Sequence, residues 1–328
     1  MQKLLTVVVP VYRVEAYINK CLDSLLVSPG LLEKLEVILV NDGTPDHSAE
    51  MSREYVKRYP EAFRQIDKKN GGHGSAWNVG LREATGRYLR FLDSDDWFTN
   101  LDRLLSDLET CEEDVIFHPF NRCYASGNRI VPVGTAVPPG APVQLSSGMW
   151  GRLSDGFSCC NFWSTTYKTS ILRPLDPLFA EKVMFDDYIL TWAPLVYGRT
   201  CRAFDYPVYN YLLGRPGQSM DLAAKRKGAR SYAKCFDQFE AVRARIPADS
   251  VPPDLLAAID ASIADYARFV FPFMKSLPFQ DSRARMTHLW SHYVKDAPKK
   301  YKMEKRFGSL PFSLFYLLEC FRSLLKRR

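Results

Sequence analysis

The first hundred residues alternate short apolar runs with segments in which apolar residues recur every three or four positions. Residues 4–12 form an unbroken, largely β-branched run, which is typical of a strand buried on both faces of a parallel sheet. Residues 15–26 show the spacing of an amphipathic helix. The same two patterns predict strands over residues 35–40, 63–67 and 87–92, and helices over residues 48–58 and 75–84. This alternation predicts an α/β fold with a doubly wound, mostly parallel sheet, whose turns converge on one crevice.

The chain changes character after residue 220. Residues 221–328 hold 21 Lys and Arg against 11 Asp and Glu, a net charge of +10, whereas residues 1–220 have a net charge of −3. Helical patterns cover residues 223–246, 253–275 and 281–294, with proline-containing breaks between them. We therefore predict two domains, a catalytic domain of residues 1–220 and a basic helical region of residues 221–328.

The last helical pattern has two interpretations. The apolar run of residues 310–318 is too short to span a bilayer, and lysines and arginines flank it. A helix here would gather the following apolar residues on one side: Leu314, Leu317, Leu318, Phe321, Leu324 and Leu325. Such a helix fits an anchor in the interface of an anionic membrane. It also fits a helix docked on the protein or on a dimer partner.

Composition narrows the class of protein. With 328 residues and 46% hydrophobic content, the chain can bury a large core. Its eight cysteines include no Cys-x-x-Cys pair, so we expect reduced thiols rather than a disulfide framework. The N-terminus shows no secretion-signal pattern. We therefore expect a cytoplasmic protein, with peripheral attachment to the inner face of the cell membrane as the alternative.

Three carboxylates stand within four residues at the end of a predicted strand, in Asp93-Ser94-Asp95-Asp96. Clustered carboxylates raise one another's pKa unless a cation lies between them. Hard oxygen ligands suit Mg²⁺ or Mn²⁺, often shared with substrate phosphates. The cluster therefore predicts a divalent metal at Asp95 and Asp93. The alternative is a solvated turn in which Asp96 caps the next helix.

Polar turns follow the other predicted strands. Tyr12 leaves the first strand after Pro10 and could present its ring to a nucleobase, or could simply pack. Asp42 could accept a hydrogen bond from a base N–H or could close an Asx-turn. Asn70 begins a glycine-rich stretch that opens a helix, so backbone N–H groups could face a phosphate or a sugar. His73, within that stretch, is predicted to lie in the loop or behind the site.

A second acidic motif lies further along the chain. Asp186 and Asp187 begin a predicted amphipathic helix that includes Trp192 and Leu195. Acids in a first helical turn are favoured by the helix dipole whatever their role. The pattern alone therefore leaves open whether this pair caps a helix or takes part in catalysis.

In this order, the motifs resemble those of the family-two glycosyltransferases of bacterial polysaccharide synthesis, which have the GT-A fold. The motifs are Val8-Val9-Pro10-Val11-Tyr12, Asn41-Asp42-Gly43-Thr44-Pro45-Asp46, Asn70-Gly71-Gly72-His73-Gly74-Ser75-Ala76-Trp77-Asn78-Val79-Gly80 and Asp93-Ser94-Asp95-Asp96. The resemblance is strong over residues 4–100, weaker to about residue 220 and absent beyond. One departure is Trp77, which stands where many members have an arginine.

The resemblance implies a role for each matching residue. The nucleotide would be held by Pro10, Tyr12, Asp42, Asn70, Asp93 and Ser94. Asp95, with Asp93, would bind the metal that bridges the diphosphate. Asp187 would deprotonate the acceptor hydroxyl, with Asp186 as the second choice. Arg215, in a segment that resembles the family's mobile loop over residues 215–219, could stabilise the leaving diphosphate or could be a surface arginine.

We therefore expect a metal-dependent, inverting glycosyltransferase of the hexosyltransferase class. Its donor would be a nucleotide sugar, by family habit a UDP-sugar, with Mn²⁺ or Mg²⁺. Its acceptor would be a saccharide or a lipid-linked saccharide, without a nucleic-acid partner, and a homo-oligomer is compatible with this function. A non-catalytic subunit is the alternative, because Trp77 replaces a family arginine. A nucleotidyltransferase fits less well, since no early glycine-rich loop with a following Arg and Lys is present.

Overall fold

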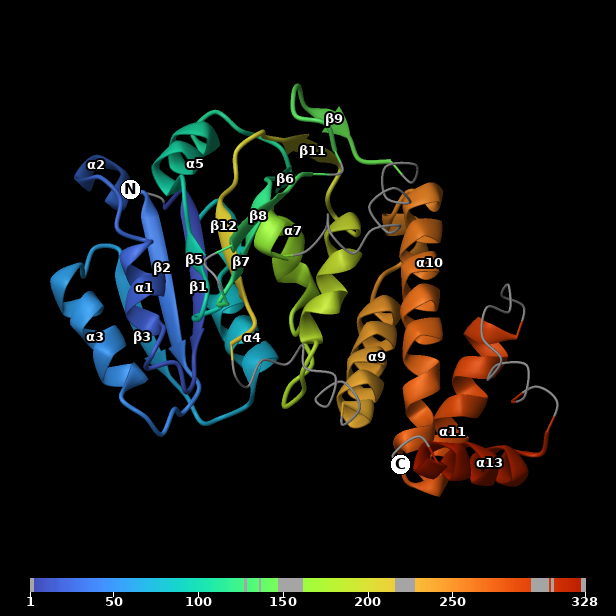
Figure 1. The fold of residues 1–328 in the computed structure, drawn as a ribbon. Coiled ribbons are helices and arrows are strands. Elements are labelled where there is room, and N and C mark those ends of the chain that lie inside the picture. Colours follow the sequence, from blue (N-terminus) through green and yellow to red (C-terminus); the bar gives the residue numbers. More distant parts are fainter. Residues whose placement is uncertain are drawn as a thin grey trace.

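An eight-stranded sheet forms the centre of the computed structural model (Figure 1), which describes residues 3–126, 129–135, 137–146, 162–215, 228–295, 307 and 310–325. Its strand order is β3-β2-β1-β4-β10-β6-β11-β9. The first four strands are parallel: β1 (Leu5–Val11), β2 (Leu35–Asn41), β3 (Phe63–Asp67) and β4 (Tyr88–Phe91). The prediction of an α/β fold with strands in these positions is confirmed.

The order of the parallel strands places the early helices. The chain moves outward from β1 to β3 and then returns to β4, so the crossover helix α4 (His73–Glu83) lies on the opposite face from α1 (Ile18–Asp23) and α3 (Ser48–Arg58). Every residue of β1 and β2 is buried, because both faces of the sheet are covered. Parallel strands with covered faces leave their carboxyl ends as the open edge.

The second half of the sheet is mixed, and a smaller sheet joins it. In the large sheet β10 is antiparallel to β4 and to β6, while β11 is parallel to β6. The remaining strands of the large sheet are β6 (Val115–Phe117), β9 (Val143–Gln144), β10 (Thr165–Lys168) and β11 (Thr200–Ala203). The small sheet has the order β5-β12-β7-β8. Its strands are β5 (Trp97–Phe98), β7 (Phe120–Tyr124), β8 (Arg129–Val133) and β12 (Tyr209–Leu213).

Shorter helices connect these strands. They are α2 (Pro29–Leu32), α5 (Leu101–Leu108), α7 (Thr169–Leu172) and the 3₁₀ helices η1 (Phe162–Ser164), η2 (Arg173–Leu175), η3 (Asp186–Thr191) and η4 (Ala193–Leu195). The amphipathic α-helix predicted from Asp186 is wrong, because two 3₁₀ helices take its place. Pro194 has no N–H, and its ring would clash with the carbonyl of Leu190 in an α-helix.

The helical C-terminal region lies beside the sheet and extends away from it (Figure 1). Its elements are α9 (Ala229–Ala244), η5 (Ala248–Ser250), α10 (Pro253–Val270), η6 (Phe271–Ser276), α11 (Phe279–Leu289), the π-helical turn η7 (Trp290–Val294) and α13 (Phe312–Leu325). The three predicted helices are confirmed within the described residues. Aromatic rings pack α9 on α10: Phe239 lies 4.5 Å from Tyr266 and Tyr232 lies 5.7 Å from Phe269, between ring centroids.

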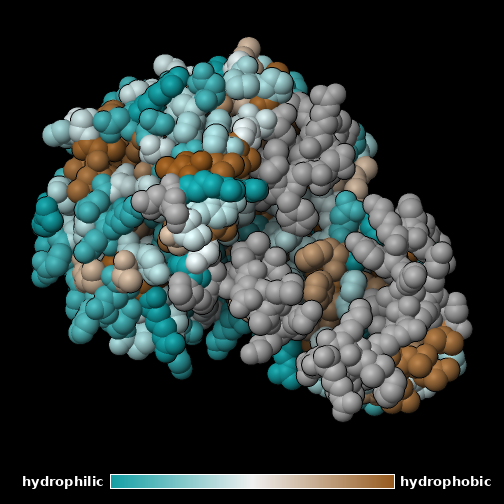
Figure 2. Space-filling view, viewed as in Figure 1, coloured by the Kyte–Doolittle hydropathy of each residue, from teal (hydrophilic) through white to brown (hydrophobic). Residues whose placement is uncertain are grey.

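Helix α13 both docks and exposes an apolar face. Phe315 is buried, and the hydroxyl of Tyr316 donates to the carbonyl of Leu277 at 2.9 Å. Leu314, Leu317 and Leu318 remain 45%, 65% and 37% exposed, and Figure 2 shows hydrophobic surface over this helix at the lower right. Among the described helices, none has the length and apolar character needed to cross a membrane.

The described cysteines are buried and are not joined to one another. They are Cys21, Cys111, Cys123, Cys201 and Cys235. Within the core they pack as small apolar side chains.

Candidate active site

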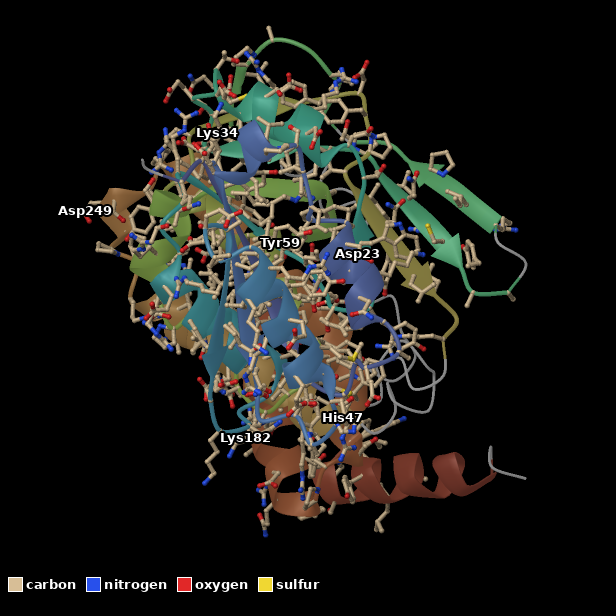
Figure 3. All side chains as sticks on the ribbon, turned by 90° about the vertical axis from the view of Figure 1, so that its left-hand side faces the viewer. Asp23, Lys34, His47, Tyr59, Lys182 and Asp249 are labelled. Carbon is tan, nitrogen blue, oxygen red and sulfur yellow. The ribbon has the colours of Figure 1, made fainter. Side chains whose placement is uncertain are left out.

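The carboxyl ends of β1, β2 and β4 open into a cleft of about 850 Å³. In Figure 3, Lys34, just before β2, lies at the upper end of the molecule, and His47, after β2, lies at the lower end. Lys182 also lies at the lower end, and its backbone N–H donates to the carbonyl of Gly71 in the glycine-rich turn. All the residues to which the family resemblance assigns a nucleotide, metal or base role line this cleft: Pro10, Tyr12, Asp42, Asn70, Asp93, Ser94, Asp95, Asp186 and Asp187. Their common location supports one reaction centre, while the role of each residue stays a prediction.

Asp42 organises the glycine-rich turn. Its buried carboxylate accepts hydrogen bonds from the backbone N–H of Gly71 at 2.8 Å and of Gly72 at 2.7 Å, and from Lys68 Nζ at 2.6 Å. The amide of Asn70 donates to the Asp42 carbonyl at 3.0 Å. Gly72 has φ of +86°, which favours glycine, so the chain can turn sharply into α4. Asp42 therefore holds the turn of residues 70–72, and Tyr12, 40% exposed, lines the same cleft.

The three acids after β4 lie within 4.8 Å of one another. Asp96 is fully buried and ties the cluster to β12, because its carboxylate accepts from the Tyr209 hydroxyl at 2.6 Å and from the Leu212 N–H at 2.7 Å. Burial, followed by the charges of Asp95 and Asp93, raises the pKa of Asp96 well above its ordinary value. The alternative reading of a solvated turn in which Asp96 caps a helix is therefore wrong.

Asp95 faces the cleft and forms an ion pair with Arg215. Burial and the nearby charge of Asp93 raise the pKa of Asp95, and the guanidinium of Arg215 opposes that rise. Arg215 thus supplies a positive charge at the carboxylate that the resemblance assigns to a metal. The remainder of the predicted mobile loop, residues 216–219, lies outside the described residues.

His73 lies between the two acidic motifs. Its Nε2 is 2.9 Å from Asp93 Oδ1, and its Nδ1 is 3.1 Å from Asp186 Oδ1. Burial lowers the pKa of His73, but the carboxylates of Asp186 and Asp93 outweigh this and raise it well above its ordinary value. The prediction that His73 lies in the loop or behind the site is wrong, because His73 begins α4 and lines the cleft, with partners from two segments distant in sequence.

The two acids of the second motif differ in surroundings. Asp186 is buried, and both of its carboxylate oxygens face His73. Asp187 is less buried and lines the cleft. Burial, with the neighbouring charge of Asp186, raises the pKa of Asp187 to about 7. A carboxylate with this pKa can take up a proton near neutral pH, as a general base must.

Several residues in or next to the cleft were missed from the sequence. Lys68 follows β3 and forms an ion pair with Asp42 of the cleft lining, and attention to the end of every strand could have found it. Tyr232 of α9 and Phe269 of α10 line the far end of the cleft beyond Asp187. Their sequence pattern is that of any helix with a buried aromatic stripe, so no local signal marks them.

A glycosyltransferase family model matches half of the chain. The model of glycosyl transferase family 2 matches residues 6–169. EpsJ of Bacillus subtilis (strain 168), an uncharacterized glycosyltransferase, is 42% identical over 118 residues, which are 35% of this chain and 33% of EpsJ. YibD of Escherichia coli (strain K12), also an uncharacterized glycosyltransferase, is 25% identical over 221 residues, 64% of this chain and 61% of YibD. The matched region thus spans about a third of EpsJ and less than two thirds of YibD.

Solved structures share the fold. Staphylococcus aureus TarS 1-349 in complex with UDP-GlcNAc has a TM-score of 0.55 at 18% identity, covering 89% of this chain and 90% of that chain. The mannosyltransferase PcManGT of Pyrobaculum calidifontis, in complex with GDP-Man and Mn²⁺, has a TM-score of 0.51 at 16% identity, covering 100% and 89%. The matched motifs lie at the carboxyl ends of the first strands and in α4, where the cleft opens. This chain therefore belongs to glycosyl transferase family 2.

Proposed function

We propose that this chain is a metal-dependent, inverting glycosyltransferase of cell-surface polysaccharide synthesis. It would transfer a hexosyl group from a nucleotide sugar, a UDP-sugar, to a saccharide or a lipid-linked saccharide. The observation that carries the proposal is one cleft with two acidic groups, Asp93 and Asp95 at the end of β4 and Asp187 at η3. Curated relatives with names from teichoic acid synthesis support the assignment to cell-surface polymers.

The donor end of the cleft suits a nucleotide diphosphate. Tyr12 offers an aromatic face, and the ordered turn of residues 70–72 offers a rigid wall beside it. Asp93, Ser94 and Asp95 line the same cleft. TarS in complex with UDP-GlcNAc and PcManGT in complex with GDP-Man share this fold, which supports a nucleotide sugar as the donor.

The acid cluster fits a hard divalent cation. Asp96 is committed to Tyr209 and Leu212, whereas Asp93 and Asp95 face the cleft. Asp95, with Asp93, would hold Mn²⁺ or Mg²⁺, because carboxylate oxygens are the ligands that these ions prefer. Such an ion, when bound, supplies positive charge that stabilises the departing diphosphate. Arg215 at Asp95 is placed to add to that charge.

Asp187 would act on the acceptor. Its carboxylate removes the proton of the acceptor hydroxyl, and the hydroxyl oxygen attacks the anomeric carbon as the bond to the diphosphate oxygen breaks. Attack from the face opposite the leaving group inverts the configuration at that carbon. Tyr188, Tyr232 and Phe269 form an aromatic wall beyond Asp187, which can bind the apolar face of a sugar ring. Residues 221–328 would therefore complete the acceptor end of a catalytic domain of residues 1–220.

Release of nucleoside diphosphate from a panel of UDP- and GDP-sugars tests this function. We expect release from at least one UDP-sugar with Mn²⁺ or Mg²⁺, and loss of release with EDTA. A saccharide acceptor should raise the rate above slow donor hydrolysis. Binding of donor without any release under all acceptor conditions would instead favour the non-catalytic subunit, and release unaffected by EDTA would contradict metal dependence.

The exposed face of α13 would contact the inner face of the cell membrane. Three exposed leucines lie on a helix that basic residues flank in the sequence. Each cation near an anionic surface contributes roughly 1 kcal/mol. The protein should therefore float with anionic vesicles more than with neutral ones. The binding should weaken with salt, since the Debye length falls from about 10 Å at 0.1 M to about 3 Å at 1 M.

A matched variant separates membrane contact from helix docking. Replacing Leu314, Leu317 and Leu318 together by serine should abolish flotation and lower Tm only slightly, because these side chains are only partly buried. Ile130→Ser changes an exposed apolar residue, 61% exposed, on β8 and should leave flotation intact. Equal flotation of the triple variant and the wild type would exclude α13 as the anchor.

A further inference from the structure

One imidazole joins two acids that come from distant parts of the chain. Asp93 follows β4, whereas Asp186 begins η3. His73, the first residue of α4, places Nε2 at 2.9 Å from Asp93 Oδ1 and Nδ1 at 3.1 and 3.2 Å from the two oxygens of Asp186. Both ring nitrogens are therefore engaged, each with a carboxylate on a different side of the reaction centre.

The position of His73 is itself held by packing. Trp77, one turn later on α4, is fully buried and lies 4.1 Å from His73 between ring centroids. The Trp77 ring in turn contacts Phe91, Phe162 and Phe179 at 4.5, 4.7 and 5.1 Å. Because Trp77 is packed on several sides, it leaves the neighbouring His73 ring few rotamers. The imidazole can therefore fix the separation of the Asp93 and Asp186 carboxylates. Trp77, the departure from the family's arginine, thus serves as the support of His73.

The same helix also holds the segment that carries the acid pair. The side-chain amide of Asn78 donates to the Phe179 carbonyl at 2.9 Å, and its oxygen accepts from the Leu178 and Phe179 N–H groups at 3.1 and 2.9 Å. Gly74 allows the close approach, because a Cβ there would lie 2.5 Å from Asp186 Oδ2. Helix α4 therefore contacts Asp186 directly through His73 and Gly74 and holds the preceding residues 178–179 through Asn78, and of these three residues His73 also contacts Asp93.

We propose that His73 is a positioning residue that sets the distance between the donor end and the catalytic base. By binding the Asp186 carboxylate, it fixes the start of η3. The adjacent Asp187 then meets the acceptor hydroxyl in line with the anomeric carbon. Asp186 then serves as the receiver of this contact rather than as the base. The inference rests on the proposed glycosyl transfer. A displacement of about 1 Å at a reacting group can cost about a hundredfold in rate.

A double-mutant cycle tests the inference. His73→Gln keeps a polar side chain but cannot reach both acids, and Asp186→Asn weakens the receiving partner. We expect each single variant to lower kcat by about 10- to 100-fold, with the donor Kd, measured by titration calorimetry, changed less than about threefold. The double variant should be no slower than the slower single variant, because both changes break one connection. His292→Ala, an exposed histidine on η7, is the control and should match the wild type.

Three results would overturn the inference. A normal kcat in His73→Gln would remove the positioning role. A rise in the donor Kd that equals the loss in kcat/KM would make His73 a donor-binding residue. Multiplicative losses in the double variant would show that His73 and Asp186 act independently. A wild-type protein that binds donor but transfers no sugar would refute the proposed function itself, and the cycle is therefore read only against an active wild type.

Discussion

Replacing Asp187 by asparagine should lower kcat by about 10²- to 10⁴-fold, the usual contribution of a general base, while leaving the donor Kd unchanged. The amide cannot accept the proton of the acceptor hydroxyl, and Asp187 is not among the residues that the proposed function assigns to the nucleotide. Transfer and donor binding are measured on the same preparation. Glu181→Gln, an exposed residue of the same segment, removes the same charge outside the cleft and should retain full activity.

The same residue predicts the pH profile. Burial and the charge of Asp186 raise the pKa of Asp187 to about 7. The base is protonated and inactive below this pH and ionised above it, so kcat should rise through a limb centred near pH 7. The Asp187→Asn variant should lack the limb. Since the raised pKa means that ionisation of Asp187 disfavours the folded state, the variant should not lower Tm at pH 8. A variant with near-normal turnover and an intact limb would assign the base to another residue.

Removing the Asp95 carboxylate should abolish the effect of metal on nucleotide binding. In Mn²⁺, Asp95→Ala should bind nucleoside diphosphate as weakly as the wild type does in EDTA, and transfer should fall by at least about 10²-fold. The fold should remain intact, because Asp95 faces the cleft and Asp96, not Asp95, ties the cluster to β12. Calorimetry with and without Mn²⁺ measures the binding.

The control for Asp95 is Asp102→Ala. Asp102 is an exposed acid in the first turn of α5 and does not line the cleft, so metal-dependent binding should persist. Binding of equal strength in Asp95→Ala and wild type, with metal present, would contradict the metal assignment. Arg215 loses its partner in Asp95→Ala, so binding in EDTA is compared for both proteins as well.

The N-terminal elements could be predicted because local and tertiary preferences agree there. The predicted helix of residues 48–58 and strand of residues 63–67 coincide with α3 and β3. Helix α4 begins at His73 rather than at Ser75, since Gly72 turns the chain before it. This small difference lies at a helix end, which the periodicity of apolar residues does not determine precisely.

The links between motifs could not be predicted, because they depend on tertiary placement. The sequence near His73 does not indicate that Asp186, more than a hundred residues away, is its partner. The α-helix predicted from Asp186 is also wrong, because the prediction followed the apolar spacing and not Pro194, which interrupts an α-helix. Tyr232 and Phe269 resemble core residues, and only the packing of α9 and α10 beside the sheet brings them to the cleft.

The cleft is built from two parts of the chain, one that the family model matches and one that it does not. Under the proposed function, most of its donor end lies within residues 6–169, the span that the family model matches, whereas the aromatic wall beyond Asp187 comes from later residues. Changes in the aromatic wall would then leave most of the nucleotide pocket unaltered. Under the proposed function, a chimera that keeps the shared span and exchanges α9 and α10 between relatives would retain its donor and acquire a new acceptor.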